Sequence, residues 1–214
     1  MADKIRKIDP NEPDHSIIQE GAEIIRNGGV VVFPTTGLYG LGADARHTDA
    51  VERVFSAKQR PADNPILILV PDMKSLNDLV EEIPSPAEKI MDRFWPGSVT
   101  LVFLARPQVL TMLTAGTGKI GIRLPAHPAA LRLVSTFGGP ITGTSANRSG
   151  EPGIWDLNDL PVEITDAVDL VLDAGPLKDG PGSTVVDVTT DPPTILREGA
   201  LATVRITELL SGLY

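Results

Sequence analysis

Two cations and an amide in one short segment are the residues of this sequence best suited to binding phosphate. In residues 56–68, "SAKQRPADNPILI", Lys58 and Arg60 precede a proline, and Asn64 precedes an apolar run. Lysine offers a point charge and arginine a planar fork of donors, and both bind phosphate oxygens. Cations at the end of a short helix also complement the negative charge of its carboxyl terminus. The segment therefore indicates either an oxyanion clamp or a helix end with complementary charge.

Two segments rich in glycine and hydroxyl groups could line a site for a small ligand. Residues 30–45, "VVVFPTTGLYGLGADA", begin as a buried strand but continue with a proline, two threonines and three glycines. This composition predicts that the strand ends near Phe33 and that a cleft wall follows, whose glycines let the backbone approach a ligand. Residues 140–152, "PITGTSANRSGEP", are either an ordinary polar loop or a cradle of hydroxyl and backbone donors.

Further polar residues stand at the ends of predicted strands. Arg123 closes "KIGIRL", Arg197 closes "TILR", and Ser183 follows "GPG" at the start of another strand. Open α/β sheets bind ligands beyond strand ends, although a cation at such a place is often exposed and inert. Each of these three residues is therefore a candidate ligand contact.

Several common kinds of active site are excluded by the residues that the sequence lacks. There is no cysteine, so disulfides, thiolate metal sites and a cysteine nucleophile are excluded, which fits a cytosolic protein. The three histidines match no metal-binding spacing, and neither a P-loop nor a G-x-S-x-G motif is present. We expect no metal site built by the protein and no covalent nucleophile.

The charge balance favours a small anionic ligand over a nucleic-acid duplex. The net charge is −9, whereas proteins that bind a duplex are usually basic because they neutralise phosphates. An RNA-binding module without catalysis remains an alternative, but only 4% of the residues are aromatic and could stack on bases. No run of 18 apolar residues occurs and the first 15 residues lack an apolar core, so we expect neither a membrane span nor a signal peptide.

Interleaved helices and strands predict an α/β fold with a mixed sheet. Helical periodicity and stop signals predict helices in residues 14–29, 48–58, 71–83, 85–94, 127–137 and 203–210. Apolar runs predict strands in residues 29–33, 64–70, 98–105, 119–124, 170–175, 183–189 and 194–199. Asp49 and Glu52 have the spacing of a capping box at the start of the second helix.

In their order along the chain, seven segments resemble the Sua5/YciO/YrdC family, from about Gly28 to Ala200. They are "FPTTGLYGLGADA", "KQRPADNPI", "FWPGSVTLVF", "GIRLPAHPAALRLV", "PITGTSANRSGEP", "GPGSTVVDVT" and "ILREGAL". The resemblance implies a YrdC-like twisted mixed parallel and antiparallel sheet, flanked by helices, with a large concave electropositive cleft. It also implies a single domain over residues 1–214, the short form of the family.

The resemblance implies a threonylcarbamoyl-AMP synthase, a nucleotidyltransferase. Such an enzyme converts L-threonine, bicarbonate and ATP, with Mg²⁺ accompanying the ATP, to threonylcarbamoyl-adenylate and pyrophosphate. The product then serves the tRNA threonylcarbamoyl-transferase machinery, which forms N6-threonylcarbamoyladenosine at adenosine 37, and a weak contact with tRNA itself is a further option. An adenylating enzyme with another acceptor is the alternative within the same class.

The resemblance also implies the residues of the site. Lys58 and Arg60 would hold the triphosphate and act in catalysis. The other nucleotide contacts would be Asn64, Lys119, Ser145, Gly153 and Arg197. The threonine contacts would be Gly37, Arg123, Gly143 and Ser183, with Thr35 and Tyr39 on the same wall.

The chain departs from the family pattern at three positions near the expected amino-acid pocket. The family commonly has an acidic residue where Thr36 stands, often a threonine in place of Gly37, and in some members a histidine in place of Leu69. These differences remove polar groups, so they affect the expected specificity for threonine more than the expected binding of the nucleotide.

Overall fold

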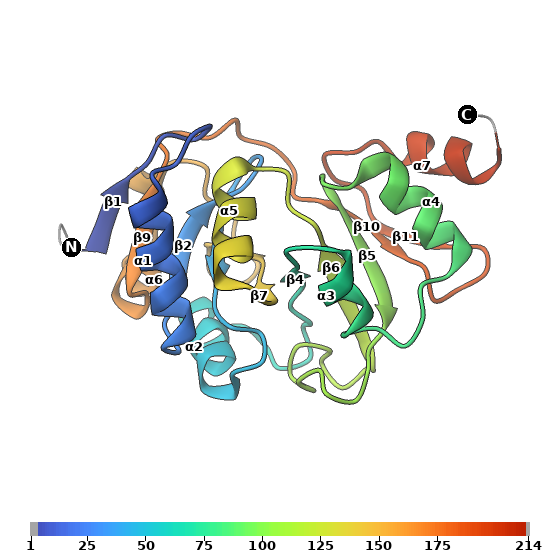
Figure 1. The fold of residues 1–214 in the computed structure, drawn as a ribbon, viewed down its shortest axis with the longest axis horizontal. Coiled ribbons are helices and arrows are strands. Elements are labelled where there is room, and N and C mark those ends of the chain that lie inside the picture. Colours follow the sequence, from blue (N-terminus) through green and yellow to red (C-terminus); the bar gives the residue numbers. More distant parts are fainter. Residues whose placement is uncertain (1–3, 213–214) are drawn as a thin grey trace.

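The computed structural model of the protein describes residues 4–212, which fold into two mixed β-sheets flanked by helices (Figure 1). The mixed α/β fold expected from the sequence is confirmed, although the strands form two sheets rather than one. Within the described part of the chain, no helix has the length and apolar composition needed to cross a membrane.

The first sheet has five strands. Their order is β1 (Ile5–Lys7), β9 (Leu170–Asp173), β2 (Val31–Pro34), β3 (Tyr39–Gly42) and β8 (Thr144–Ser145). The β1–β9 and β9–β2 pairs are parallel, whereas β3 is antiparallel to both of its neighbours. Since β2 and β3 form a hairpin, residues 35–38 make a tight turn at one end of this sheet.

The second sheet has six strands. Their order is β11 (Thr194–Arg197), β10 (Thr184–Asp187), β5 (Val99–Leu104), β6 (Lys119–Arg123), β4 (Ile68–Leu69) and β7 (Ile141–Thr142). Only the β10–β5 and β4–β6 pairs are parallel. Therefore Arg123, the last residue of β6, lies beside Leu69, the last residue of β4.

Most helices form where periodicity places them. The helices of the described residues are α1 (His15–Arg26), α2 (Thr48–Lys58), α3 (Met73–Asn77), α4 (Ser85–Phe94), α5 (Pro128–Phe137), α6 (Val162–Ala167) and α7 (Thr203–Leu210), with a 3₁₀ turn at Leu157–Asp159. Of these, α6 was not predicted from the sequence, and α3 covers only part of the helix predicted in residues 71–83. The predicted capping box is wrong, because the N-cap of α2 is His47, two residues before Asp49. The His47 side chain accepts a hydrogen bond from the Ala50 amide.

The strand β3 is the main departure from the sequence prediction, which ended the strand at Phe33 and expected an irregular wall. Gly40 and Gly42 instead belong to a regular strand and lie against the Phe33 ring. A Cβ at Gly42 would come within 2.9 Å of Phe33 Cε1. The two glycines therefore make room for a buried aromatic ring in the neighbouring strand, although Gly40 also borders the cleft described below.

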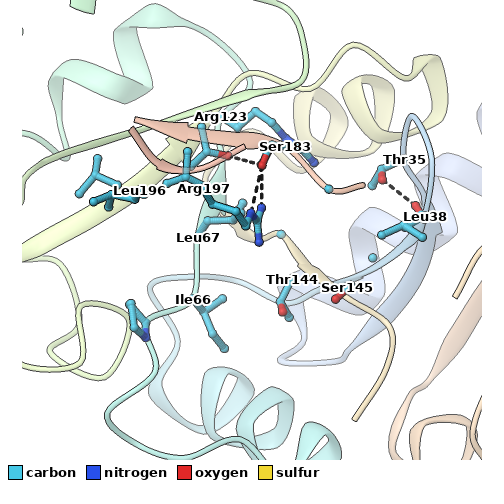
Figure 2. A pocket seen from close by; sticks show the side chains of 18 of the residues that line it. Thr35, Leu38, Ile66, Leu67, Arg123, Thr144, Ser145, Ser183, Leu196 and Arg197 are labelled. Carbon is cyan, nitrogen blue, oxygen red and sulfur yellow. Dashed lines mark hydrogen bonds between the residues drawn. The ribbon is translucent and has the colours of Figure 1, made fainter. Parts of the chain in front are cut away.

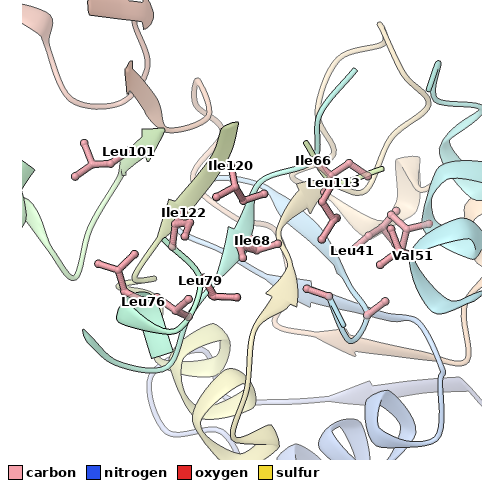
Figure 3. Close-up of a cluster of buried hydrophobic side chains, with 14 of the residues drawn as sticks. Leu41, Val51, Ile66, Ile68, Leu76, Leu79, Leu101, Leu113, Ile120 and Ile122 are labelled. Carbon is pink, nitrogen blue, oxygen red and sulfur yellow. The ribbon is translucent and has the colours of Figure 1, made fainter. Parts of the chain in front are cut away.

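A continuous apolar core connects the two sheets. One cluster of buried side chains includes Leu41 of the first sheet, Val51 of α2, and Ile68, Leu101 and Ile120 of the second sheet (Figure 3). The two sheets thus share one hydrophobic core, so that loops from both can line a single site.

Gly143 is the point at which the chain passes from one sheet to the other. It separates β7, which pairs with β4, from β8, which pairs with β3. A Cβ at this position would lie 2.7 Å from Leu67 Cδ1 and 2.8 Å from Leu69 Cγ, closer than packed carbon atoms approach. Glycine is therefore required by the packing of β4 against this crossing.

Replacing Gly143 with alanine should destabilise the fold by about 1–3 kcal/mol, because the added methyl group overpacks the two leucines. Urea denaturation measures the change in the free energy of unfolding. Gly180→Ala is the control, since a Cβ there would meet only Lys178 O, at an ordinary 3.6 Å. Equal stability of both variants would show that Leu67 and Leu69 move aside without cost.

Candidate functional site

A cleft of about 620 Å³ is lined by residues of both sheets (Figure 2). Strands β5, β6, β10 and β11 supply one wall, and the β2–β3 hairpin with β8 supplies the other. This is an ordinary size for a pocket that binds a small molecule or cofactor.

Most of the residues expected from the sequence line this cleft. They are Thr35, Tyr39, Arg60, Lys119, Arg123, Gly143, Ser145, Gly153, Ser183 and Arg197. Gly37, Lys58 and Asn64 are not among the lining residues, nor are Thr36, which is exposed, and Leu69, which is buried in β4. The topology thus brings together segments that are far apart in the sequence.

Arg123 places a buried cation in the cleft, and no carboxylate of residues 4–212 forms an ion pair with it. The residue is 8% exposed, and its buried Nε has no hydrogen-bond partner among residues 4–212. Burial, followed by the nearby charge of Arg197, lowers the pKa of the Arg123 guanidinium to about 10. A buried, unpartnered donor on a cation is costly, so this site is suited to an anionic ligand that supplies the missing acceptor.

Ser183 lies next to the two arginines (Figure 2). Its hydroxyl is 2.7 Å from the Thr100 hydroxyl, and its carbonyl oxygen accepts hydrogen bonds from Arg197 Nη2 at 2.7 Å and Nε at 3.3 Å. The hydroxyl pair is buried and the Arg197 side chain is held along the rim. Arg123, Ser183 and Arg197 consequently form one polar cluster.

Asp187 is a cleft residue that the sequence reasoning missed. It accepts a hydrogen bond from Lys119 Nζ at 2.9 Å and two from the amide and hydroxyl of Thr189. Burial opposes ionisation of Asp187, but these hydrogen bonds outweigh it and hold the pKa of the carboxyl below its ordinary value. The signal was available: Asp187 ends a buried strand that begins beside Ser183.

Arg60 reaches the cleft because the chain turns sharply after α2. Gln59 adopts a left-handed conformation, with φ 48° and ψ 44°, and ends the helix. Arg60 Nε then donates to Asn64 O at 3.0 Å, and Nη2 donates to Pro65 O at 2.7 Å. The guanidinium is thereby held in place at the cleft, and Asn64 contributes its backbone to that position.

Lys58, in contrast, is buried in the protein and does not line the cleft. Its side chain is 1% exposed, and Nζ donates to Ser145 O at 2.5 Å, Asn147 O at 2.7 Å and Asn147 Oδ1 at 3.4 Å. Burial, with a smaller effect from the charge of Arg60, lowers the pKa of the Lys58 ammonium to about 7.

The stability of the protein should therefore rise with pH relative to that of a Lys58→Met variant. Between the folded pKa of about 7 and the ordinary value of 10.5, the unfolded chain binds more protons at Lys58 than the folded chain. The free energy of unfolding then increases by at most about 1.4 kcal/mol per pH unit. Urea denaturation of both proteins between about pH 7 and pH 9 measures this difference. A constant difference would mean that Lys58 keeps an ordinary pKa.

The hairpin end is held by its own hydrogen bonds. Thr35 Oγ1 donates to Leu38 O at 2.6 Å, and the Cβ of a residue replacing Gly37 would meet Gly180 N at an ordinary 3.7 Å. Tyr39 is fully buried, with its hydroxyl donating to Gly175 O, and burial raises its pKa to about 12. Tyr39 therefore borders the cleft as a structural residue, whereas Thr35 and Gly37 leave room beside the loop at Gly180.

The comparisons with known proteins identify the family of the chain. The family model Sua5_yciO_yrdC, described as "Telomere recombination", matches residues 23–199. The chain belongs to this family. It is 36% identical over 215 residues to a threonylcarbamoyl-AMP synthase of Bacillus subtilis (strain 168), covering 100% of this chain and 61% of that protein. A synthase of the same name from Pyrococcus abyssi (strain GE5 / Orsay) is 41% identical, with 86% and 54% covered.

Solved structures show the same fold in other Sua5/YciO/YrdC proteins. The P. abyssi Sua5 structure complexed with L-threonine has a TM-score of 0.92 and 37% identity, and covers 96% of this chain and 60% of that one. The structure of E. coli YciO has a TM-score of 0.85 and 28% identity, with 94% and 97% covered. The chain thus spans less than two thirds of the first relatives, but nearly the full length of YciO.

Proposed function

We propose that the protein is an L-threonylcarbamoyladenylate synthase, which uses L-threonine, bicarbonate and ATP and releases pyrophosphate. The observation that carries the proposal is the buried Arg123 guanidinium, which lines the cleft with an unpartnered Nε. The relatives named threonylcarbamoyl-AMP synthase, and the P. abyssi Sua5 structure with L-threonine, support this choice of substrate.

Arg123 would bind the carboxylate of threonine. A carboxylate accepts two parallel hydrogen bonds from a guanidinium, and it would supply the acceptor that Nε lacks. The neighbouring Ser183 hydroxyl, which is hydrogen-bonded to the Thr100 hydroxyl, would orient the amino acid. Gly143 and Gly37 would leave space for it rather than contact it through side chains.

The remaining cations would bind ATP. Arg60, Lys119 and Arg197 line the same cleft as Arg123, so that they surround a space in which a triphosphate would carry compensating negative charge. Ser145 and Gly153 would provide contacts from the opposite wall, and Asn64 would act by holding Arg60.

The reaction needs positioning and charge stabilisation more than a reactive side chain. The amine of threonine combines with bicarbonate to form a carbamate and water, and a carbamate oxygen then attacks the α-phosphorus of ATP. The bond from the α-phosphorus to the bridging oxygen breaks, and pyrophosphate leaves. Holding the carbamate in line with the phosphate accounts for acceleration without a covalent intermediate.

Mg²⁺ would accompany ATP rather than occupy a cage made by the protein. Within residues 4–212 no group of three or more histidine, cysteine, aspartate or glutamate side chains is placed to hold a metal ion. Asp187, a carboxylate of the cleft, already pairs with Lys119. Phosphate oxygens with water would therefore provide the ligands, as Mg²⁺ prefers. The bound ion would supply charge neutralisation of the triphosphate.

The product would serve the machinery that transfers threonylcarbamoyl to adenosine 37 of tRNA. A direct tRNA contact, if made, would be weak and salt-sensitive, because the chain carries a net charge of −9.

A pyrophosphate-release assay tests the proposal. The protein is incubated with ATP and Mg²⁺, with and without bicarbonate, across a set of amino acids. Release that requires bicarbonate and is fastest with threonine supports a synthase of this kind. Release with a different amine identifies another acceptor. RNA binding whose affinity falls steeply with salt concentration, without any release of pyrophosphate, favours an RNA-binding module.

A further inference from the structure

Residues 145–149 follow on from the cleft wall at Ser145 and are held by the end of α2. Ser145 lines the cleft, and its carbonyl oxygen accepts a hydrogen bond from Lys58 Nζ. Asn147 accepts two more from the same Nζ, through its carbonyl and side-chain oxygens. The Ser149 amide in turn donates to the Lys58 carbonyl at 2.8 Å. Both the side chain and the backbone of Lys58 therefore hold this segment.

These contacts use the full donor capacity of the Lys58 ammonium. A lysine ammonium has three N–H donors, and the structure provides three oxygen acceptors for them. Within the described residues no carboxylate pairs with Lys58, and the side chain is 1% exposed. To contact a phosphate in the cleft, Nζ would have to leave at least one of these acceptors.

Arg60 acts on the same segment from the other side. Its Nη1 lies 3.5 Å from Ser149 Oγ, while Nε and Nη2 are held by backbone carbonyls. The left-handed Gln59 between the two cations directs Lys58 inward and Arg60 toward the cleft. Lys58 is thus buried behind the cleft wall, whereas Arg60 lines the cleft.

We propose that Lys58 is a positioning residue, whose ammonium fixes the backbone of residues 145–149 so that Ser145 and Arg60 face the nucleotide. Lys58 does not itself bind the triphosphate. The proposal rests on the proposed function for the identity of the ligand, but the hydrogen bonds that carry it belong to the protein alone. It replaces the direct phosphate contact expected for Lys58 from the sequence.

Two variants and three measurements test this role. Lys58→Met removes the donors and keeps an unbranched apolar stem. Asn147→Ala is the matched variant, because it removes no charge and lies outside the cleft lining, yet Asn147 Nδ2 ties the segment together through Arg148 O and Glu151 O. Amide hydrogen–deuterium exchange of the ligand-free protein, ATP binding by calorimetry and steady-state pyrophosphate release are measured at about pH 6, where Lys58 is charged.

We expect both variants to have faster amide exchange in residues 145–149 and a kcat/KM for ATP lower by about tenfold to 100-fold, because misplaced contacts weaken the transition state. The KM for threonine stays near that of the wild type. The proposal would be overturned if Lys58→Met bound ATP more weakly with unchanged amide exchange while Asn147→Ala kept normal turnover. That result would mean that Lys58 contacts the phosphates directly. Faster exchange with normal turnover and ATP affinity would overturn it as well, since the anchor would then serve folding only.

The design separates this proposal from the proposed function. If the wild type releases no pyrophosphate with any amino acid, the synthase assignment fails, while exchange and ATP calorimetry still decide the role of Lys58. If Lys58→Met does not fold, Asn147→Ala alone gives the result: faster exchange with weaker ATP binding supports positioning, and faster exchange with unchanged binding refutes it.

Discussion

Replacing Arg123 with methionine should raise the KM for L-threonine roughly 100-fold and leave the KM for ATP near the wild-type value. The substitution removes the buried partner of the substrate carboxylate, and such a charged contact contributes about 3 kcal/mol. The ligand-free variant should be at least as stable as the wild type, because a buried cation with an unpartnered Nε has been replaced by an apolar side chain. Steady-state pyrophosphate release and urea denaturation measure the two effects.

Arg123→Lys is the matched control for this experiment. Lysine keeps the charge but lacks the planar fork that binds a carboxylate through two hydrogen bonds, so it should restore little of the threonine affinity. An equal rise in both KM values would show that Arg123 does not discriminate between the two substrates. A large loss of stability in Arg123→Met would show that the guanidinium serves the fold.

Replacing Arg60 with methionine should reduce kcat/KM for ATP by roughly 100-fold. The substitution removes a fixed positive charge that would stabilise the negative charge of the reacting phosphates. Binding of ATP should weaken far more than binding of adenosine, since the nucleoside carries no phosphate. Arg60 is held by the carbonyls of Asn64 and Pro65, so its charge is already in position before ATP binds. Calorimetry with ATP and adenosine, together with pyrophosphate release, tests this prediction.

Arg26→Met provides a control with the same change of net charge. Arg26 is exposed on α1, outside the cleft, where its side chain donates to Thr136 O. This variant should keep normal turnover. If Arg26→Met and Arg60→Met lose activity alike, the effect comes from net charge and not from the position of Arg60.

Much of the fold followed from local patterns. The helices from 48 to 58, 85 to 94 and 203 to 210 have the predicted bounds, because apolar spacing and neighbouring prolines or glycines define them within the segment itself. The strands β5, β6, β9, β10 and β11 also lie where apolar runs predicted them. The short strands β1, β7 and β8 and the short helix α6 were missed, since elements of two to six residues have too little periodicity to be recognised without their partners.

The glycines of β3 show where local reasoning predicted the location correctly but not the local structure. The stretch was interpreted as a cleft wall whose glycines make room for a ligand, and its hairpin does line the cleft. However, a Cβ at Gly40 or Gly42 would first meet the ring of Phe33. The contact depends on the register between β2 and β3, which places Phe33 opposite Gly40. Composition alone does not distinguish space needed by a ligand from space needed by a neighbouring side chain.

The sequence by itself determined the element types, the inventory of cations and hydroxyls, and the ordered motifs that indicate the family. Only the tertiary structure decided which groups meet: Lys119 with Asp187, Ser183 with Thr100, and Lys58 with the segment behind the cleft. These contacts join residues 68, 83 and 87 positions apart. Their burial and hydrogen bonding depend on how β10 pairs with β5 and β8 with β3, and the order of strands across a sheet is not encoded in any local window.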